Sequence, residues 1–439
     1  MFARRQRTSQ KKTPPAPSSQ AIQCAVGFEV EVKNWNTWKP VMPEVLFESF
    51  GRYKEEYRKA HSKKDLLFKG KDFDLTADRP TEDSVPEFVT KPFAETPEGL
   101  DQMREVFRRI QGMLHSMHAK ALEYPERLQS INRFAKEGKV VDPEASIDAL
   151  EQPDLHPQAN VGIRLGSVPE LFERSGRFPA KRKADERLTR IKYVNTPEAQ
   201  AEMRSMVRVK QRVLDAIERF RMWYEPYPDW EPSETFIGLC CYLAHYLDCP
   251  MINFKTYTKS AFPIMARTDF AAMYELLPPQ EFFYFQLGGG IHFQTLFELI
   301  RFESNGDMPL DLKNQIFEKG TRQDQDQPLV DQINGLSREN WLLNITQGMD
   351  LLTERNYPGL DDQADELDTL GSWGETYDRV GTQPKRVPIL ELRRIQYVRD
   401  IDELSAVADD IFHTVLELNG TRMPVPPSAE ASGQSPAHS

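Results

Sequence analysis

Several common catalytic motifs are missing from this 439-residue sequence. It contains no P-loop, no GxGxxG stretch, no HExxH motif and no internal repeat. It also lacks the Ser/His and Cys/His arrangements that are typical of enzymes with a covalent nucleophile. The sequence therefore argues against a P-loop NTPase, a dinucleotide-binding enzyme, a HExxH metalloprotease and a triad hydrolase.

Cysteine is scarce, with four residues that show no repeated metal-binding spacing: Cys24, Cys240, Cys241 and Cys249. The adjacent Cys240 and Cys241 lie in an apolar stretch with helical character, so we expect them to be buried and reduced. This pattern favours a reducing compartment, and we predict a cytoplasmic protein.

Long apolar runs and excess positive charge are absent as well. The longest apolar stretch, around 236–247, is too short to cross a bilayer, and the basic, polar first twenty residues lack the apolar region of a signal peptide. The formal net charge is −11, from 56 basic and 67 acidic residues, which disfavours a general nucleic-acid-binding surface. We predict no membrane and no nucleic-acid partner. The sequence is compatible with an oligomer and does not specify one.

Composition divides the chain into three parts. Residues 1–20 are rich in Arg, Lys, Pro, Ser and Gln, and residues 421–439 in Pro, Ser and Ala, so both are predicted to be disordered tails. Residues 21–420 form the predicted folded domain. Within it, 174–192 carries eight basic and two acidic residues. A solvated loop is the favoured interpretation, and a cover over a nucleotide or a docking surface for an acidic partner is the alternative.

The stretch Gly27–Val32 alternates apolar and acidic residues, which predicts a β-strand. Glu29 and Glu31 would project from one face, roughly 7 Å apart. Taken alone, the pair fits a strand whose acidic face is solvated.

Other predicted strands also display polar side chains. Glu87 lies in a short strand closed by Pro92, and Glu391 shares a strand face with Arg393. If these strands are neighbours, several carboxylates meet on one side of a sheet, where their repulsion is costly unless a divalent cation binds them. The alternative is that the acids are scattered and solvated.

Long helices are predicted from about 96 to 118 and from 196 to 224, each starting with a capping Thr followed by Pro and Glu. The strands between the helices do not follow a regular βαβ order. This arrangement favours an α+β fold with a mainly antiparallel sheet.

Four motifs in order resemble the amidoligase family, within the glutamine synthetase and glutamate–cysteine ligase superfamily of carboxylate–amine ligases. They are GFEVEV at 27–32, PEFVTKPF at 86–93, HPQANVGIRL at 156–165 and LELRRI at 390–395. The resemblance spans about 21–418 and implies a sheet of the glutamine synthetase catalytic type. It also implies that ATP phosphorylates a substrate carboxylate, of a small molecule or a peptide, and that an amine then displaces phosphate to form an amide.

The resemblance also implies roles for individual residues. Magnesium ions bridging the ATP phosphates would be held by four carboxylates, Glu29, Glu31, Glu87 and Glu391. Arg393 would stabilise the phosphoryl group during transfer, and Arg267 resembles a later family arginine that faces phosphate. Gln158 and Asn160, in the predicted central strand, would contact metal or nucleotide.

Family members commonly place a His in that central strand, where this chain has Gln158 and Asn160. This difference motivates a second hypothesis, a ligase-like scaffold or binding protein without activity. A third hypothesis is a phosphoryl- or nucleotidyl-transferring enzyme that modifies a protein or peptide, with 174–192 as its docking surface.

Overall fold

The structure is a computed structural model of the whole chain. It describes the following residues: 25–40, 58–62, 65–78, 84–125, 128–134, 138–176, 197–224, 229–248, 263–302, 305–314, 337–350, 377–378, 386–393, 395 and 397–420. The two predicted tails and most of the basic stretch, from 177 onwards, lie outside these residues, as do Cys24 and Cys249.

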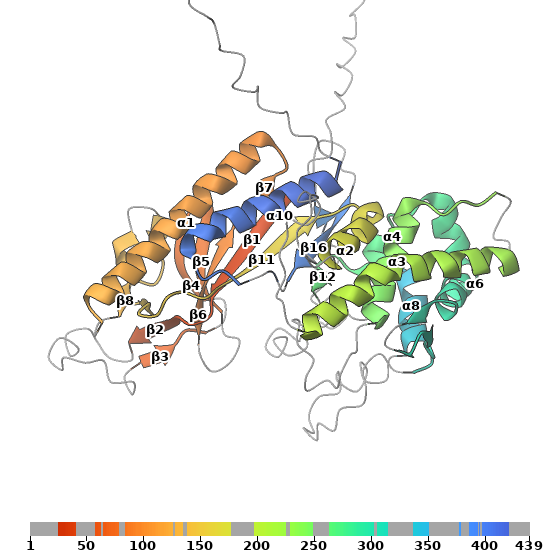
Figure 1. The fold of residues 1–439 in the computed structure, drawn as a ribbon, viewed down its shortest axis with the longest axis horizontal. Coiled ribbons are helices and arrows are strands. Elements are labelled where there is room, and N and C mark those ends of the chain that lie inside the picture. Colours follow the sequence, from red (N-terminus) through yellow and green to blue (C-terminus); the bar gives the residue numbers. More distant parts are fainter. Residues whose placement is uncertain are drawn as a thin grey trace, which may run out of the picture.

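A mainly antiparallel sheet is the centre of the fold (Figure 1). Its main strand order is β12-β16-β11-β1-β6-β5-β4-β9, and β7 and β15 pair with β1 and β16. The strands are β1 (Ala25–Val32), β4 (Leu66–Gly70), β5 (Phe73–Asp78), β6 (Val85–Thr90), β7 (Phe93–Ala94), β9 (Gly138–Val140), β11 (Leu155–Gly162), β12 (Ile264–Ala266), β15 (Tyr377–Asp378) and β16 (Val387–Leu392). Together with the helices, this sheet confirms the predicted α+β class.

Two smaller sheets accompany the central one. The first has the order β3-β2-β10-β8 and the second pairs β13 with β14. Their strands are β2 (Asn36–Pro40), β3 (Arg58–Ala60), β8 (Gln129–Ser130), β10 (Ser146–Asp148), β13 (Arg301–Phe302) and β14 (Met308–Pro309).

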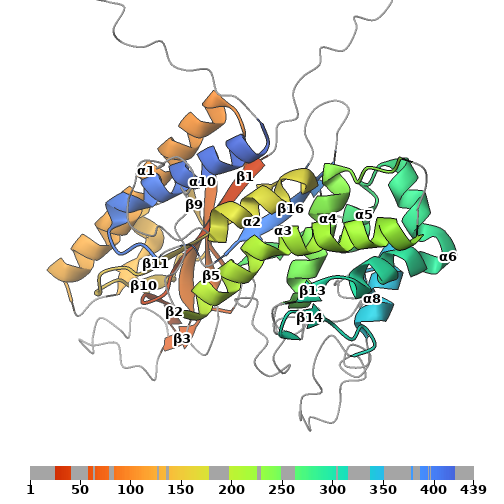
Figure 2. The same ribbon diagram turned by 45° about the vertical axis from the view of Figure 1, so that its right-hand side comes forward.

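Alternation along β1 separates an apolar face of the sheet from a polar one. Phe28 and Val30 are buried on the apolar face, and the Phe28 ring meets the Phe107 ring of α1 (Pro97–Glu123) edge-on at 5.0 Å. Helix α10 (Leu404–Leu418) lies beside α1 in both ribbon views (Figures 1 and 2) and also contacts β1 and β11. The apolar face is therefore covered by two helices, and Glu29 and Glu31 project from the opposite face.

The other helices gather near the edge formed by β16 and β12 (Figure 2). They are α2 (Val168–Gly176), α3 (Pro197–Tyr224), α4 (Glu234–Asp248), α5 (Phe270–Tyr274), α6 (Pro279–Glu298) and α8 (Arg338–Thr346). Short 3-10 helices cover Ile131–Phe134, Leu165–Ser167 and Ile401–Glu403. In α4, Cys240 and Cys241 are free and buried, as predicted. None of the helices in the described part of the chain is long and apolar enough to cross a membrane.

Three glycines divide α6 into two helical parts. Gly288, Gly289 and Gly290 have φ values of 64°, 74° and 93°, in the left-handed region that side chains disfavour. A Cβ on Gly290 would also lie 2.3 Å from Oγ1 of Thr346. The three glycines thus form a turn inside α6, and α6 packs against α8.

Candidate functional site

The polar face of the central sheet collects side chains from five adjacent strands. Strand register places Glu31 opposite Glu87, Glu29 opposite Gln158, and Asn160 opposite Glu391. Paired residues in antiparallel strands share a face, so these side chains lie on the same side of the sheet. The separate acidic strands found in the sequence are therefore neighbours in space.

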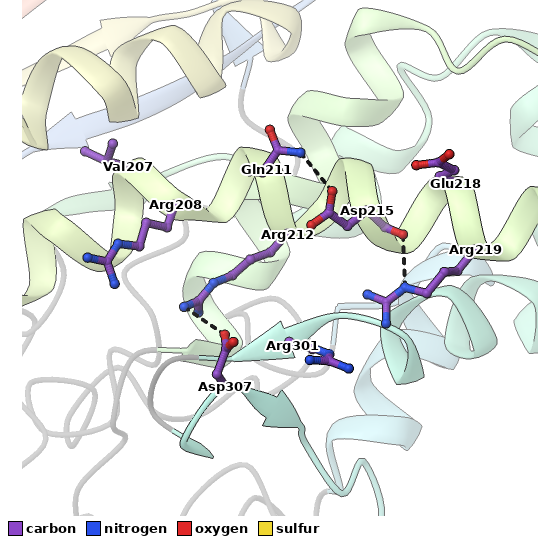
Figure 3. A pocket seen from close by; sticks show the side chains of 9 residues that line it. All are labelled: Val207, Arg208, Gln211, Arg212, Asp215, Glu218, Arg219, Arg301 and Asp307. Carbon is purple, nitrogen blue, oxygen red and sulfur yellow. Dashed lines mark hydrogen bonds and ion pairs between the residues drawn. The ribbon is translucent and has the colours of Figure 1, made fainter.

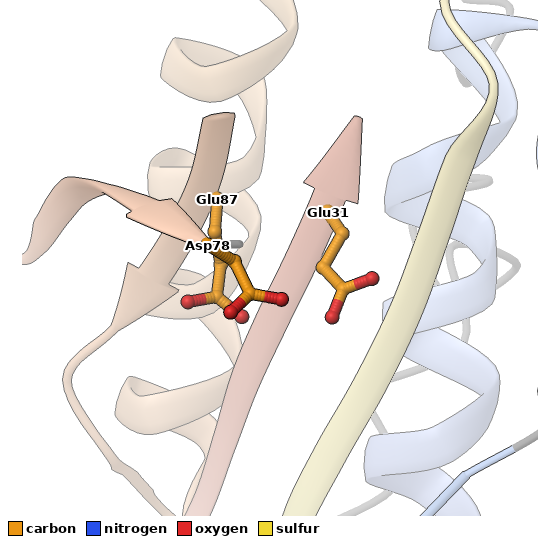
Figure 4. Close-up of side chains that lie close together, drawn as sticks. All are labelled: Glu31, Asp78 and Glu87. Atoms are coloured by element: carbon orange, nitrogen blue, oxygen red, sulfur yellow. The ribbon is translucent and has the colours of Figure 1, made fainter. Parts of the chain in front are cut away.

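Three carboxylates form the densest part of this face (Figure 4). One oxygen each of Glu31, Asp78 and Glu87 lies within 4.8 Å of the other two. Asp78, at the end of β5, was not among the site residues predicted from the sequence. The alternation of Asp74, Thr76 and Asp78 along β5 is the sequence signal that could have identified it. We call these three residues the acidic triad.

Burial and mutual repulsion raise the pKa values of three acids on this face, Glu29, Glu31 and Glu87. Desolvation, followed by the charges of Glu29, Asp78 and Glu31, raises the pKa of Glu87 to about 8. Burial is also the main cause of the raised pKa of Glu29, to which Glu391 adds, and of the raised pKa of Glu31, which Lys33 partly offsets. The face is therefore poised to take up protons or a cation.

Amide side chains of β11 orient two of the carboxylates. Nδ2 of Asn160 donates to Oε1 of Glu29 at 2.7 Å, and Nε2 of Gln158 donates to Oε1 of Glu31 at 3.2 Å. Oδ1 of Asn160 is buried and, within the described part of the chain, accepts no hydrogen bond. A buried amide oxygen beside a carboxylate offers the hard oxygen ligands that magnesium prefers, so the residues present fit a divalent cation.

Glu391 binds two arginines. Its side chain is fully buried, and its carboxylate oxygens lie 2.6 Å from Nη2 of Arg267 and 3.2 Å from Nη1 of Arg393. Both guanidinium groups are mostly buried, with 9% and 17% of their side chains exposed. The ion pairs hold the two arginines at the end of the polar face formed by β16 and β12.

His156 lies on β11 beside Glu31 of the acidic triad. It pairs in register with Glu31, approaches Asp154 at 3.3 Å, and stacks on Tyr397 with a centroid distance of 3.6 Å. Burial lowers the pKa of His156, which keeps the imidazole neutral over a wider pH range. Tyr397, which the sequence did not indicate, is 45% exposed.

A cavity of about 320 Å³ adjoins Glu29 and Asn160. Most of its lining is apolar, including Val89 and Ile389. A Cβ added to Gly27 would meet nothing within 4 Å, so this glycine leaves the cavity wall open. The acidic face is therefore next to a space that can take part of a small molecule.

All eight residues predicted from the sequence lie on or beside this face, and their individual roles stay predictions. The metal-ligand candidates Glu29, Glu31 and Glu87 lie together. The fourth, Glu391, is near Glu29 and has both oxygens directed at arginines. Arg174, the first residue of the predicted basic loop, instead lies in α2 and pairs with Glu170 and Glu417.

The raised pKa of Glu87 predicts a pH dependence of stability. The folded metal-free protein holds a proton on Glu87 up to about pH 8, whereas the unfolded chain loses it near 4.5. The unfolding free energy should therefore fall as pH rises between these values, by up to about 1.4 kcal/mol per pH unit for one proton. Urea unfolding in EDTA at several pH values measures the slope.

Glu87→Gln is the matched variant, and we expect it to flatten that slope. Magnesium should stabilise the wild type more at the alkaline end of the range, because the carboxylates that would bind it have lost their protons. An equal slope in wild type and variant would contradict the assigned pKa.

Comparisons with known proteins give two distant structural neighbours. One is a Vibrio cholerae toxin from the MARTX/VgrG family, with a TM-score of 0.40 and 11% identity, covering 91% of this chain and 99% of that one. The other is a mutant ACD domain of a VgrG Vibrio cholerae toxin in complex with ADP and Mn²⁺, with a TM-score of 0.34, 11% identity and coverages of 90% and 99%. The sequence matches no protein-family model and no curated protein. At these scores the two likenesses carry no argument about activity.

Proposed function

We propose that this chain is an ATP- and magnesium-dependent ligase that forms an amide bond between a carboxylate and an amine. The observation that carries the proposal is the polar sheet face, where acids from four strands meet two arginines. The order of the four sequence motifs that resemble the amidoligase family also supports it. The substrates are proposed to be a small-molecule or peptide carboxylate and an amine.

The acidic triad, Glu29 and the free Oδ1 of Asn160 would hold magnesium in this proposal. The raised carboxyl pKa values of Glu29, Glu31 and Glu87 support it, because a bound cation relieves the repulsion between buried carboxylates. When bound, magnesium neutralises charge on the ATP phosphates. Gln158 and Asn160 fix the directions of Glu31 and Glu29 through the hydrogen bonds that their amides donate.

The two arginines would stabilise charge during phosphoryl transfer. A substrate carboxylate attacks the terminal phosphorus of ATP, the bond to ADP breaks, and an acyl phosphate forms. The guanidinium groups of Arg267 and Arg393, held by Glu391, supply fixed positive charge for the equatorial oxygens. The amine nitrogen then attacks the acyl carbon, loses a proton and displaces phosphate.

The cavity beside Glu29 is the proposed place for part of the nucleotide. It adjoins the acidic face, and apolar walls with a few polar groups are typical of sites for small molecules. Thr90, which lines this cavity, accepts a hydrogen bond from the backbone of Phe28 through its hydroxyl. This bond ties β6 to β1 at the cavity wall.

Product analysis with purified full-length protein tests the proposal. We expect the protein, given ATP, magnesium, a mixture of carboxylates and hydroxylamine as the amine, to release ADP and form hydroxamates. Glu29→Ala should abolish both products. Release of AMP would instead support the nucleotidyl-transfer hypothesis, and no magnesium-dependent turnover with any mixture would support the scaffold hypothesis.

A further inference from the structure

A second charged cavity lies on the helical part of the fold, lined by α3 and by β13 with the turn that follows it (Figure 3). Its volume is about 650 Å³, and four arginines line it: Arg208, Arg212, Arg219 and Arg301. We call this cavity the arginine groove. The reaction proposed above uses none of its residues.

The helix sequence aligns three of these arginines. Arg208, Arg212 and Arg219 are spaced by four and seven residues, which places them within about 40° of one another around the helix. They span about 17 Å along its axis. Arg301 comes from β13 and lines the same groove. The positive charge therefore forms a row and not a single point.

One position in the row already binds a carboxylate of the chain itself. Nη2 of Arg212 lies 3.2 Å from Oδ1 of Asp307, and its Nη1 lies 3.9 Å from the buried Asp248. Asp307 has a φ of 64°, a conformation that few residues other than glycine adopt. The turn thus directs a carboxylate, 66% exposed, at this guanidinium group.

The other end of the row has guanidinium groups available for a ligand. Nε of Arg219 donates to the backbone oxygen of Asp215, and the Asp215 carboxylate accepts from Gln211 at 2.8 Å (Figure 3). Within the described part of the chain, neither Arg219 nor Arg301 forms an ion pair with a carboxylate. A guanidinium group binds a planar carboxylate through two parallel hydrogen bonds, and these two groups line one cavity.

We propose that the arginine groove binds an extended acidic segment of a partner protein. Alternate side chains of an extended strand project about 7 Å apart, so such a segment can offer separate carboxylates to Arg219 and to Arg301. The groove also contains three carboxylates, Asp215, Glu218 and Asp307. These groove carboxylates would repel the dense charge of a polyphosphate. The separated carboxylates of an extended peptide can instead lie between the groove carboxylates. The proposal does not depend on the ligase activity.

Fluorescence anisotropy with a labelled octaglutamate peptide tests the groove. The full-length protein is titrated in EDTA, so that metal at the acidic face does not bind the peptide. We expect Arg219→Glu/Arg301→Glu to raise Kd by about tenfold or more for each lost guanidinium contact. Arg219→Gln/Arg301→Gln, which adds no new charge, should weaken binding less but clearly, and far-UV circular dichroism checks that each variant is folded.

The matched control is Arg221→Glu/Arg386→Glu, which makes the same charge change outside the groove. Arg221 lies on the same helix and pairs with the exposed Glu231, and Arg386 pairs with Glu275. We expect this control to change Kd by less than about threefold, since neither Arg221 nor Arg386 lines the groove. Equal losses in both double variants, no binding by the wild type, or tighter binding of tripolyphosphate at the groove would each overturn the proposal.

Discussion

Replacing Glu391 with Gln is expected to lower the free energy of unfolding by about 3–5 kcal/mol. The carboxylate is fully buried between Arg267 and Arg393. Its loss leaves two mostly buried guanidinium groups without their shared counter-charge, while the side-chain volume is nearly unchanged. Urea unfolding with a common m-value for wild type and variant measures the difference.

Asp409→Asn is the matched control for this effect. Asp409 also binds a guanidinium group, that of Arg104 at 2.6 Å, but both side chains are substantially exposed. We expect a loss of at most about 1 kcal/mol for the control, because water screens surface ion pairs. Similar losses in the two variants would show that Glu391 is not the buried partner of both arginines.

Arg393→Met is expected to lower kcat/KM of the proposed ligase about a thousandfold. Methionine keeps the apolar length of the side chain and removes the charge that would face the phosphoryl oxygens. Arg393→Lys should recover only part of the rate, because a lysine cannot donate two parallel hydrogen bonds. Initial rates of ADP release at several ATP concentrations separate the effect on kcat from that on KM.

Arg386→Met is the control for this experiment, because it removes an arginine just before the same strand. Arg386 is half exposed and pairs with Glu275, away from Glu391. The activity of the Arg386→Met variant should stay within about twofold of wild type, as for other surface substitutions. An Arg393→Met enzyme within tenfold of wild type would exclude a direct role in the transition state.

Local sequence patterns predicted much of the fold. The alternation in Gly27–Val32 defines β1, and its acidic and apolar faces are those of the sheet. Thr96 caps α1 by accepting from the backbone of Gly99, and Pro97 begins the helix, as predicted. These features depend on neighbours in the chain, which is why one sequence suffices to find them.

Features that depend on pairing between distant strands were harder to predict. Asp78 joins the acidic triad because β6 pairs with β5 on one side and with β1 on the other, and the pairing of Glu31 with Glu87 joins residues more than fifty positions apart. The pairing of Arg267 with Glu391 likewise arises from strands more than a hundred residues apart.

One local feature was also missed. Helix α2 was not predicted, although its Glu170 and Arg174 are spaced for an ion pair within a helix.

Binding of a non-hydrolysable ATP analogue is the measurement that tests the central claim most directly. Calorimetric titration with and without magnesium compares the wild type with Glu29→Gln/Glu31→Gln, and uses Asp101→Asn/Glu105→Gln on the exposed side of α1 as the control. The proposal predicts magnesium-dependent binding in the wild type and the control, and at least a hundredfold loss in the Glu29 and Glu31 variant. Binding that is independent of magnesium, or equally strong in all three proteins, would contradict a nucleotide and metal site at the acidic face.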